Sequence, residues 1–215
     1  NADQFVESFS ETSNSTYYLF VGKATAYTSS TTGGSDSTPP APADAPGDTE
    51  FYAWDSMLAA KNVTSSDVSY AIPRRNWANG DTYDMYDDDI SSSSTTTSGA
   101  SNLYASTFYF MTSDYRVYKV LDNNAGAAYS GAEPTSESTS PFELGGYVLK
   151  YMYAITTSEA AKYLTSDFIP VSNDSTITAA ATDGGIESLK ITAGTGYTNG
   201  TYYAAIYGDG TSAGT

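Results

Sequence analysis

The chain has 215 residues, with 25 Asp and Glu against 9 Lys and Arg, and its formal net charge is −16. It contains no Cys and no His, which excludes disulfides, thiolate metal sites, a catalytic thiol and the usual Ser-His-Asp triad. The negative charge argues against binding to a nucleic-acid phosphate backbone, and no apolar run has the roughly 18 residues that a membrane helix needs. With 20 Tyr and an aromatic fraction of 14%, the chain has enough aromatic side chains to fold.

The N-terminal part predicts an arm, a strand and a long loop. Residues 1–16 are polar and indicate an arm or a first strand. Tyr17–Gly22 is a dense run of β-formers that is apolar at both alternations, which is typical of a strand buried on both faces. Residues 28–48 are rich in Ser, Thr, Gly, Pro and Asp, and they predict a long loop.

A short helix is expected next. Thr49 is a suitable N-cap, and Phe51, Trp54 and Leu58 follow at i, i+3, i+7 spacing. This spacing places the three side chains on one face of a helix that runs to about Asn62.

The middle of the chain predicts a loop followed by a β-hairpin. Ser91–Ser98 consists only of hydroxyl residues and predicts an exposed loop or linker. Leu103–Met111 and Tyr115–Asp122 read as two strands, and the three residues between them suit a hairpin turn. We expect the loops at 28–48 and 91–101 to become ordered only within an assembly, because such long loops often lie against a partner.

The C-terminal part predicts one more strand and a second helix, followed by a change in amino-acid composition. Alternation in Tyr147–Ile155 predicts a strand with one shared face formed by Tyr147, Leu149, Tyr151, Tyr153 and Ile155. Thr156 and Glu159 form a capping box that opens a short helix through Leu164. From residue 183 the sequence becomes rich in Gly and Tyr. The coarse expectation is a mainly-β protein with two short helices and long loops.

The acidic cluster is the one candidate cation site in the sequence. It consists of Asp84, Asp87, Asp88 and Asp89. Its spacing does not match the EF-hand pattern, so a solvated acidic face or an ion-pair partner for basic residues is the favoured interpretation. Paired carboxylates acting on a sugar are a further, weaker possibility. No catalytic residue, cofactor site or metal site is predicted.

Arg74 and Arg75 form the only basic pair. In so acidic a chain we expect them to pair with carboxylates such as Asp81 or Asp84, with Trp77 stacked on one of them. Two interpretations stay open. One is an anchor at a subunit interface, and the other is an internal structural clamp.

Several segments together resemble a known family. Ile72–Trp77 reads Ile-Pro-Arg-Arg-Asn-Trp and follows a segment that contains Trp54 and Met57. Tyr18–Lys23, Tyr115–Asp122, Gly146–Ile155 and Tyr163–Val171 occur in the same order as similar segments of that family. In this combination, residues 17–171 resemble the baseplate wedge protein of T-even-type contractile-tailed phages, the gene-8 product family.

The resemblance implies a β-sandwich that is a structural protein and not an enzyme. It would be located in the virion tail baseplate after synthesis in the host cytoplasm. Its partners would be other wedge proteins, with a homodimer within the wedge and no nucleic acid, membrane or cofactor. Arg74, Arg75, Trp77 and Trp54 are the candidates for interface or clamp residues.

The domain organisation follows from where the resemblance stops. Residues 1–182 would form the wedge-like region, which needs downstream chain to complete it. Residues 183–215 depart from the family and resemble the start of a Gly-rich β repeat or of a small inserted β domain. We therefore expect a longer native polypeptide, with a short mature protein as the alternative. The alternative function is an acidic, Tyr-rich β-sandwich module that binds glycan or a host surface.

Overall fold

The computed structural model describes residues 2–11, 16–22, 26–27, 34–39, 41, 54–182, 195–196, 198 and 200–201. The chain divides into two compact units, Asn1–Ser69 and Tyr70–Thr215. Both contain small antiparallel sheets with few short helices, so the mainly-β prediction is confirmed. The domain boundary predicted after residue 182 and the Gly-rich repeat stay predictions, because most of residues 183–215 lie outside the described part.

The first unit contains a two-stranded sheet and a short helix. Helix α1 (Ala2–Ser8) lies where an arm or strand was expected. The ring centroids of Phe5 and Phe9 are 5.0 Å apart. Strand β1 (Tyr17–Gly22) forms as predicted and pairs with β2 (Met57–Val63). The prediction that β1 is buried on both faces is wrong, since Leu19 is 67% exposed.

The predicted helix through Asn62 is also wrong. Residues 54–55 are helical, but the next residues enter β2, which pairs with β1 from Tyr17↔Val63 to Gly22↔Met57. Leu58 is 65% exposed and Trp54 is 67% exposed, so the helical spacing of these two residues does not mark a buried face. The long-range backbone pairing with β1 overrides the local periodicity, as is common for short apolar patterns.

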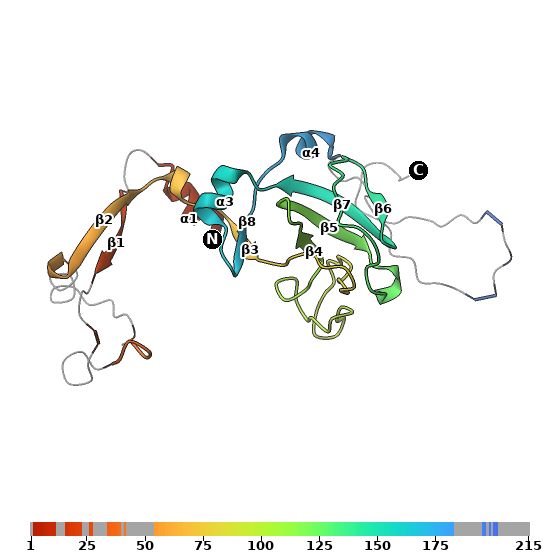
Figure 1. The fold of residues 1–215 in the computed structure, drawn as a ribbon, viewed down its shortest axis with the longest axis horizontal. Helices are drawn as coiled ribbons and strands as arrows, with labels where there is room; N and C mark the ends of the chain where they lie inside the picture. Colours follow the sequence, from red (N-terminus) through yellow and green to blue (C-terminus); the bar gives the residue numbers. More distant parts are fainter. Residues whose placement is uncertain are drawn as a thin grey trace. The chain divides into compact units, whose positions relative to one another are not determined.

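The second unit is built on a four-stranded antiparallel sheet (Figure 1). Its strands are β4 (Tyr109–Met111), β5 (Arg116–Asp122), β7 (Tyr147–Ala154) and β6 (Phe142–Leu144), in this spatial order. The predicted hairpin is present as β4–β5, although its first strand is shorter than expected because residues 103–105 form a turn. A separate two-stranded sheet pairs β3 (Ala71–Pro73) with β8 (Phe168–Pro170).

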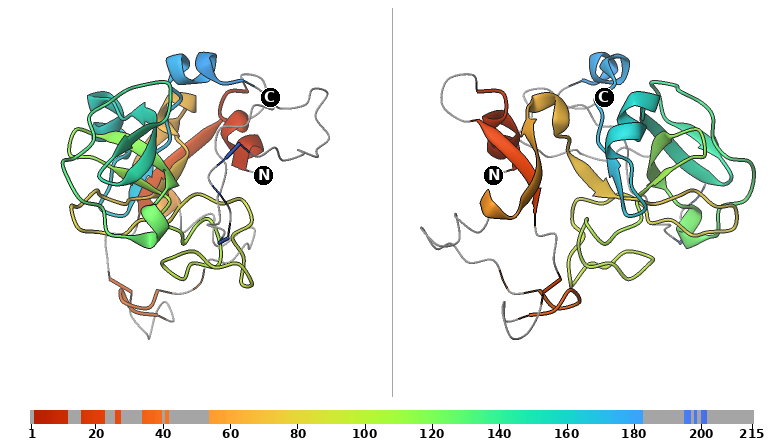
Figure 2. Two further views of the ribbon diagram at one scale, coloured as in Figure 1. Left: turned by 90° about the vertical axis from the view of Figure 1, so that its right-hand side faces the viewer. Right: turned by 60° about the vertical axis from the view of Figure 1, so that its left-hand side comes forward.

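Short helices follow the main sheet in the chain. Helix α3 (Thr157–Tyr163) begins with the predicted capping box between Thr156 and Glu159, and it lies beside β8 (Figure 2). Helix α4 (Ser175–Ala180) was not predicted. Its N-cap is Asp174, whose carboxylate accepts hydrogen bonds from two backbone N–H groups. Single 3-10 turns occur at Ser65–Asp67 and Asn124–Gly126.

The first core covers one face of the four-stranded sheet and is rich in tyrosine. Its buried members are Tyr83, Phe110, Tyr118, Val120, Tyr129, Tyr147, Leu149 and Tyr151. Tyrosine hydroxyls at this core donate to loop carbonyls: Tyr83 to Ala78 (3.3 Å), Tyr118 to Ser136 (2.9 Å), Tyr129 to Ala132 (2.9 Å) and Tyr147 to Ala127 (2.6 Å). The rings thus fill the core while the hydroxyls fasten the surrounding loops.

The second core lies on the opposite face, against β3, β8 and α3. Its buried members are Tyr109, Met111, Val117, Tyr153, Ile155 and Ile169. Tyr109 donates to the Pro73 carbonyl at 2.6 Å, and Tyr153 donates to the Pro170 carbonyl at 3.0 Å. These two hydroxyls attach the small β3–β8 sheet to the main sheet. The described residues show no larger second sheet, so a full β-sandwich stays a prediction.

At Met152, strand β7 carries one extra residue relative to β5, whereas β5 carries one extra residue at Leu121. Val117 pairs with Tyr153 and Tyr118 pairs with Tyr151, so Met152 stands between them outside the register. Because successive strand residues point to opposite faces, the bulge moves Tyr153 to the face opposite Tyr151. The prediction of one shared face along this whole strand is therefore wrong beyond Tyr151.

The tyrosine cores predict a characteristic loss of stability in alkali. Burial raises the pKa of Tyr83, Tyr129 and Tyr151 to about 12, from an ordinary value of 10.0. A raised folded-state pKa means that this contribution to stability is complete below pH 10 and is lost as the pH rises toward 12. We expect the last part of the phenolate absorbance to appear together with the loss of near-UV circular dichroism. Complete ionisation near pH 10 without unfolding would contradict this expectation.

Candidate functional site

The segment Ile72–Trp77 joins the two sheets of the second unit. It leaves β3 and runs beside β4, where the Arg75 carbonyl accepts a hydrogen bond from Met111 N–H at 2.7 Å. Trp77 N–H in turn donates to the Met111 carbonyl at 2.8 Å. The segment therefore reaches from the β3–β8 sheet to the edge of the four-stranded sheet.

Both arginine side chains bind backbone carbonyls. Arg75 Nη2 donates to the carbonyls of Tyr104 and Ala105, each at 3.0 Å, and its guanidinium lies 5.7 Å from the Tyr109 ring centroid. Arg74 Nη1 donates to the Thr165 carbonyl at 2.8 Å. The guanidiniums thus fix one turn and one loop that approach β3 from different parts of the chain.

The predicted pairing with carboxylates is wrong. Within residues 54–182, neither arginine forms an ion pair with Asp81 or Asp84. The Asp84 carboxylate is occupied by donors of the hydroxyl-rich loop, whereas the turn at residues 103–105 offers carbonyls that need donors.

Trp77 packs against Tyr129 and not against an arginine. Its ring meets that of Tyr129 edge-on, with centroids 5.8 Å apart. Trp77 Nε1 and Arg75 Nε are both buried without a hydrogen-bond acceptor among the described residues. Each such group costs about 1–3 kcal/mol, which the packing around it must offset. These internal contacts favour the structural-clamp interpretation for Arg74, Arg75 and Trp77.

Trp54 differs from the other three candidates. It belongs to the first unit and is 67% exposed. Several apolar side chains of β1 and β2 are also exposed: Tyr18, Leu19, Phe20, Val21 and Leu58. An exposed apolar group of this kind is typical of a surface that contacts another protein.

The carboxylate of Asp84 is fully buried and fastens the hydroxyl-rich loop. It accepts hydrogen bonds from Ser98 N–H and Oγ–H, both at 2.7 Å, from Thr107 N–H at 2.8 Å and from Ser106 Oγ–H at 3.1 Å. Burial acts to raise the pKa of Asp84, but the hydrogen bonds from Thr107 and Ser98 outweigh it and lower the pKa below its ordinary value.

The hydroxyl-rich loop is therefore anchored within this chain. Besides the Asp84 bonds, Thr96 N–H donates to the Ala100 carbonyl at 3.1 Å. These contacts argue against the expectation that residues 91–101 become ordered only in an assembly. The loop at 28–48 lies mostly outside the described residues.

The acidic cluster does not form a shared site. Asp84 points into the core region, while Asp88 and Asp89 are exposed. The Asp87 carboxylate accepts a hydrogen bond from Asp89 N–H at 3.0 Å, which closes a local turn. No group of three or more acidic side chains in the described part of the chain is placed to hold a metal ion. Nothing in the local sequence marks Asp84 as the buried member of the four.

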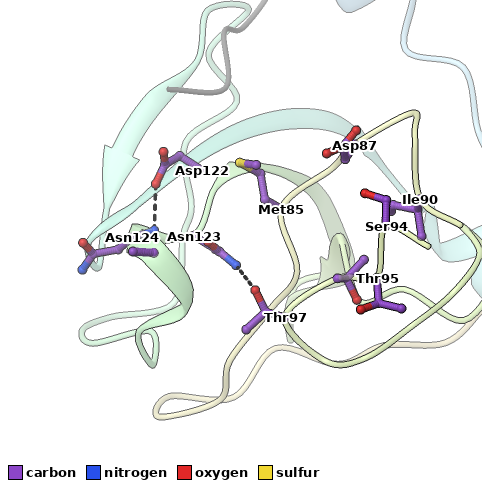
Figure 3. A pocket seen from close by; sticks show the side chains of 11 residues that line it. Met85, Asp87, Ile90, Ser94, Thr95, Thr97, Asp122, Asn123 and Asn124 are labelled. Atoms are coloured by element: carbon purple, nitrogen blue, oxygen red, sulfur yellow. Dashed lines mark hydrogen bonds between the residues drawn. The ribbon is translucent and has the colours of Figure 1, made fainter. Parts of the chain in front are cut away.

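Among the hollows on the described part of the second unit, two differ clearly in the chemistry of their lining. One is polar and lies between the hydroxyl-rich loop and the turn at residues 122–125 (Figure 3), with a volume of about 470 Å³. The other is an apolar groove of about 390 Å³ on the side of the second core, lined among others by Leu103, Tyr104 and Met152. The sequence analysis identified neither of them.

Comparisons with known proteins add no relative. No known protein family matches this chain, and no curated protein is significantly similar to it. Among the described helices, none combines the length and the apolar character that crossing a bilayer requires.

The buried carboxylate predicts a specific acid sensitivity. We expect Asp84→Asn to lower the free energy of unfolding by about 2–3 kcal/mol at neutral pH, because an amide cannot accept all of these bonds. Since the folded-state pKa is lowered from 3.8, this contribution is present above about pH 4 and is lost as the pH falls through the folded-state pKa. Urea unfolding across acidic pH should show a smaller acid dependence in the variant. Asp88→Asn, at an exposed position, should match the wild type, and equal effects of both changes would contradict this assignment.

The clamp interpretation is tested at Arg75. We expect Arg75→Lys to lower the free energy of unfolding by about 1.5–3 kcal/mol, since lysine keeps the charge but not the planar fork that reaches two carbonyls. Chemical denaturation of the isolated chain measures this change. Unaltered stability would instead indicate an interface role.

Proposed function

We propose that this chain is a structural component of a phage tail baseplate wedge, with no enzymatic activity. The proposal rests on the resemblance over residues 17–171 and on where the resembling segments lie. Ile72 pairs with Ile169 across β3 and β8, and the strands β5 and β7, which carry two further segments, are neighbours. Trp77 is bonded to β4 beside them. Four of the resembling segments thus belong to one folded unit: Ile72–Trp77, Tyr115–Asp122, Gly146–Ile155 and Tyr163–Val171. Tyr18–Lys23 lies in the first unit. The grouping of the four segments supports a common fold with that family.

In this role the second unit would be a rigid block that neighbouring wedge proteins contact. Internal anchors keep its loops in place, so its surface has a defined shape. The exposed apolar residues of β1 and β2 would contact partners, which are other wedge proteins and a second copy of the chain. The β-sandwich and the Gly-rich repeat belong to the same proposal.

The alternative of a Tyr-rich glycan-binding surface has less support. Seven tyrosines are buried in the two cores: Tyr83, Tyr109, Tyr118, Tyr129, Tyr147, Tyr151 and Tyr153. They are therefore not available as an aromatic platform, and their abundance is explained by packing and loop anchoring.

Immunogold electron microscopy of the phage particles that carry this protein tests the proposal. We expect antibodies against the second unit to label the end of the contractile tail at the baseplate. Pre-immune serum and an antibody against the sheath serve as controls. Labelling of the capsid or sheath, or no labelling of intact and detergent-opened particles, would contradict the wedge assignment.

A further inference from the structure

The polar hollow of Figure 3 has a defined chemical lining. Residues 94–97, all of them Ser or Thr, form one side, and the turn with Asn123 and Asn124 forms the other. The carboxylates of Asp87 and Asp122 also line it. Its volume of about 470 Å³ lies within the range of small-molecule sites, which is about 300–1,000 Å³.

The turn side of this hollow is held in a strained conformation. Asn124 and Ala125 both have positive φ, at 52° and 55°, a region that costs about 1 kcal/mol or more for residues with a side chain. Buried Asn123 holds this turn: its Oδ1 accepts from Gly126 N–H at 3.1 Å, and its Nδ2 donates to the Tyr83 carbonyl at 3.0 Å. The lining groups are therefore positioned before any ligand arrives, which lowers the entropic cost of binding.

The two sides of the hollow are tied to each other. Asn123 Nδ2 also donates to Thr97 Oγ1 at 3.1 Å, which connects the turn to the hydroxyl-rich loop. That loop is itself fixed by buried Asp84 through Ser98. The spacing across the hollow is thus set by hydrogen bonds at its base, so that a ligand meets a formed site.

The lining selects a class of ligand. None of the lining residues is Lys or Arg, so the only charged groups that phosphate or another anion would meet are the carboxylates of Asp87 and Asp122. Hydroxyl and amide groups both donate and accept, and carboxylates accept, which suits a neutral molecule with many hydroxyls. Met85 and Ile90 provide apolar contact for the C–H faces of such a molecule. We infer that this hollow binds a short neutral saccharide, and this inference does not depend on the wedge assignment.

Nuclear magnetic resonance of the full chain tests the site. Titration with glucose, galactose, mannose, N-acetylglucosamine, maltose and lactose at millimolar concentration should produce saturable shifts for at least one sugar. The shifts should be confined to the backbone amides of 85–90, 94–97 and 122–126 and to the side-chain amides of Asn123 and Asn124. Absence of shifts there with every sugar, or shifts there with CaCl₂ alone, would overturn the inference.

Paired variants separate this site from unspecific binding. Asp87→Asn removes a charged acceptor that lines the hollow and should weaken sugar binding by about tenfold or more. Asp88→Asn makes the same chemical change at the next, exposed residue, which does not line the hollow, and should leave the affinity within about twofold. Thr95→Val is a second lining variant, used if Asp87→Asn disturbs the spectrum as a whole. Equal losses in the lining and control variants would overturn the assignment.

Discussion

The hydrogen bond from a buried tyrosine hydroxyl to a loop carbonyl is the interaction on which the second unit depends. A four-stranded sheet with a three-residue strand at each edge offers little backbone pairing of its own. Tyrosine supplies a large apolar ring to the core and keeps a polar end that must find a partner. Here those partners are carbonyls of residues 78–136 and of the β3–β8 sheet, such as Ala127 and Pro170. The same side chains therefore build the core and hold the irregular chain that covers it. This packing also requires glycine at position 145, because a Cβ atom on Gly145 would lie 2.6 Å from the Tyr129 ring.

Polar side chains with several hydrogen bonds hold the hydroxyl-rich loop and the turn after β5 in a similar way. The Asp84 carboxylate accepts hydrogen bonds from Ser98 and Thr107 and so holds both residues in place. The Asn123 side chain connects the turn after β5 to Thr97. Ordering the backbone of such loops costs roughly 1–2 kcal/mol for each residue. A buried carboxylate or amide offsets that cost because leaving it unpaired would be unfavourable as well. The abundance of Ser and Thr in these loops then has a structural reason: short hydroxyl side chains satisfy buried acceptors without requiring apolar volume.

The sequence predicted the local features well and the long-range ones poorly. The capping box of Thr156 and Glu159, the β5 strand and the mainly-β class depend on neighbouring residues, and all are confirmed. The prediction of a helix around Leu58 was wrong because this segment pairs with β1, whose residues lie about forty positions away in the sequence. The bulge at Met152 has no marker in the strand sequence, so the alternation of tyrosines continued past the point where the faces exchange. The contacts of Arg74, Arg75 and Trp77 are internal, but the partners predicted for Arg74 and Arg75 were wrong because charge alone suggested carboxylates. A turn or loop carbonyl that accepts a hydrogen bond from an arginine distant in the chain has no marker in the sequence.

This last point also changes how the net charge of −16 is understood. Arg116 forms ion pairs with Asp114 and Glu137. The guanidiniums of Arg74 and Arg75 instead donate hydrogen bonds to backbone carbonyls of the same unit. Two of the three arginines therefore form no ion pair with a carboxylate in the described part of the chain. The guanidiniums at positions 74 and 75 stabilise the fold by holding a turn and a loop, whereas carboxylates such as Asp88 are exposed to solvent. Exposed charges contribute little to stability but strongly affect the rate and selectivity of association, so we expect the exposed carboxylates at the surface to matter mainly for association. A partner that approaches this surface should accordingly present a basic rim around whatever apolar contact it makes.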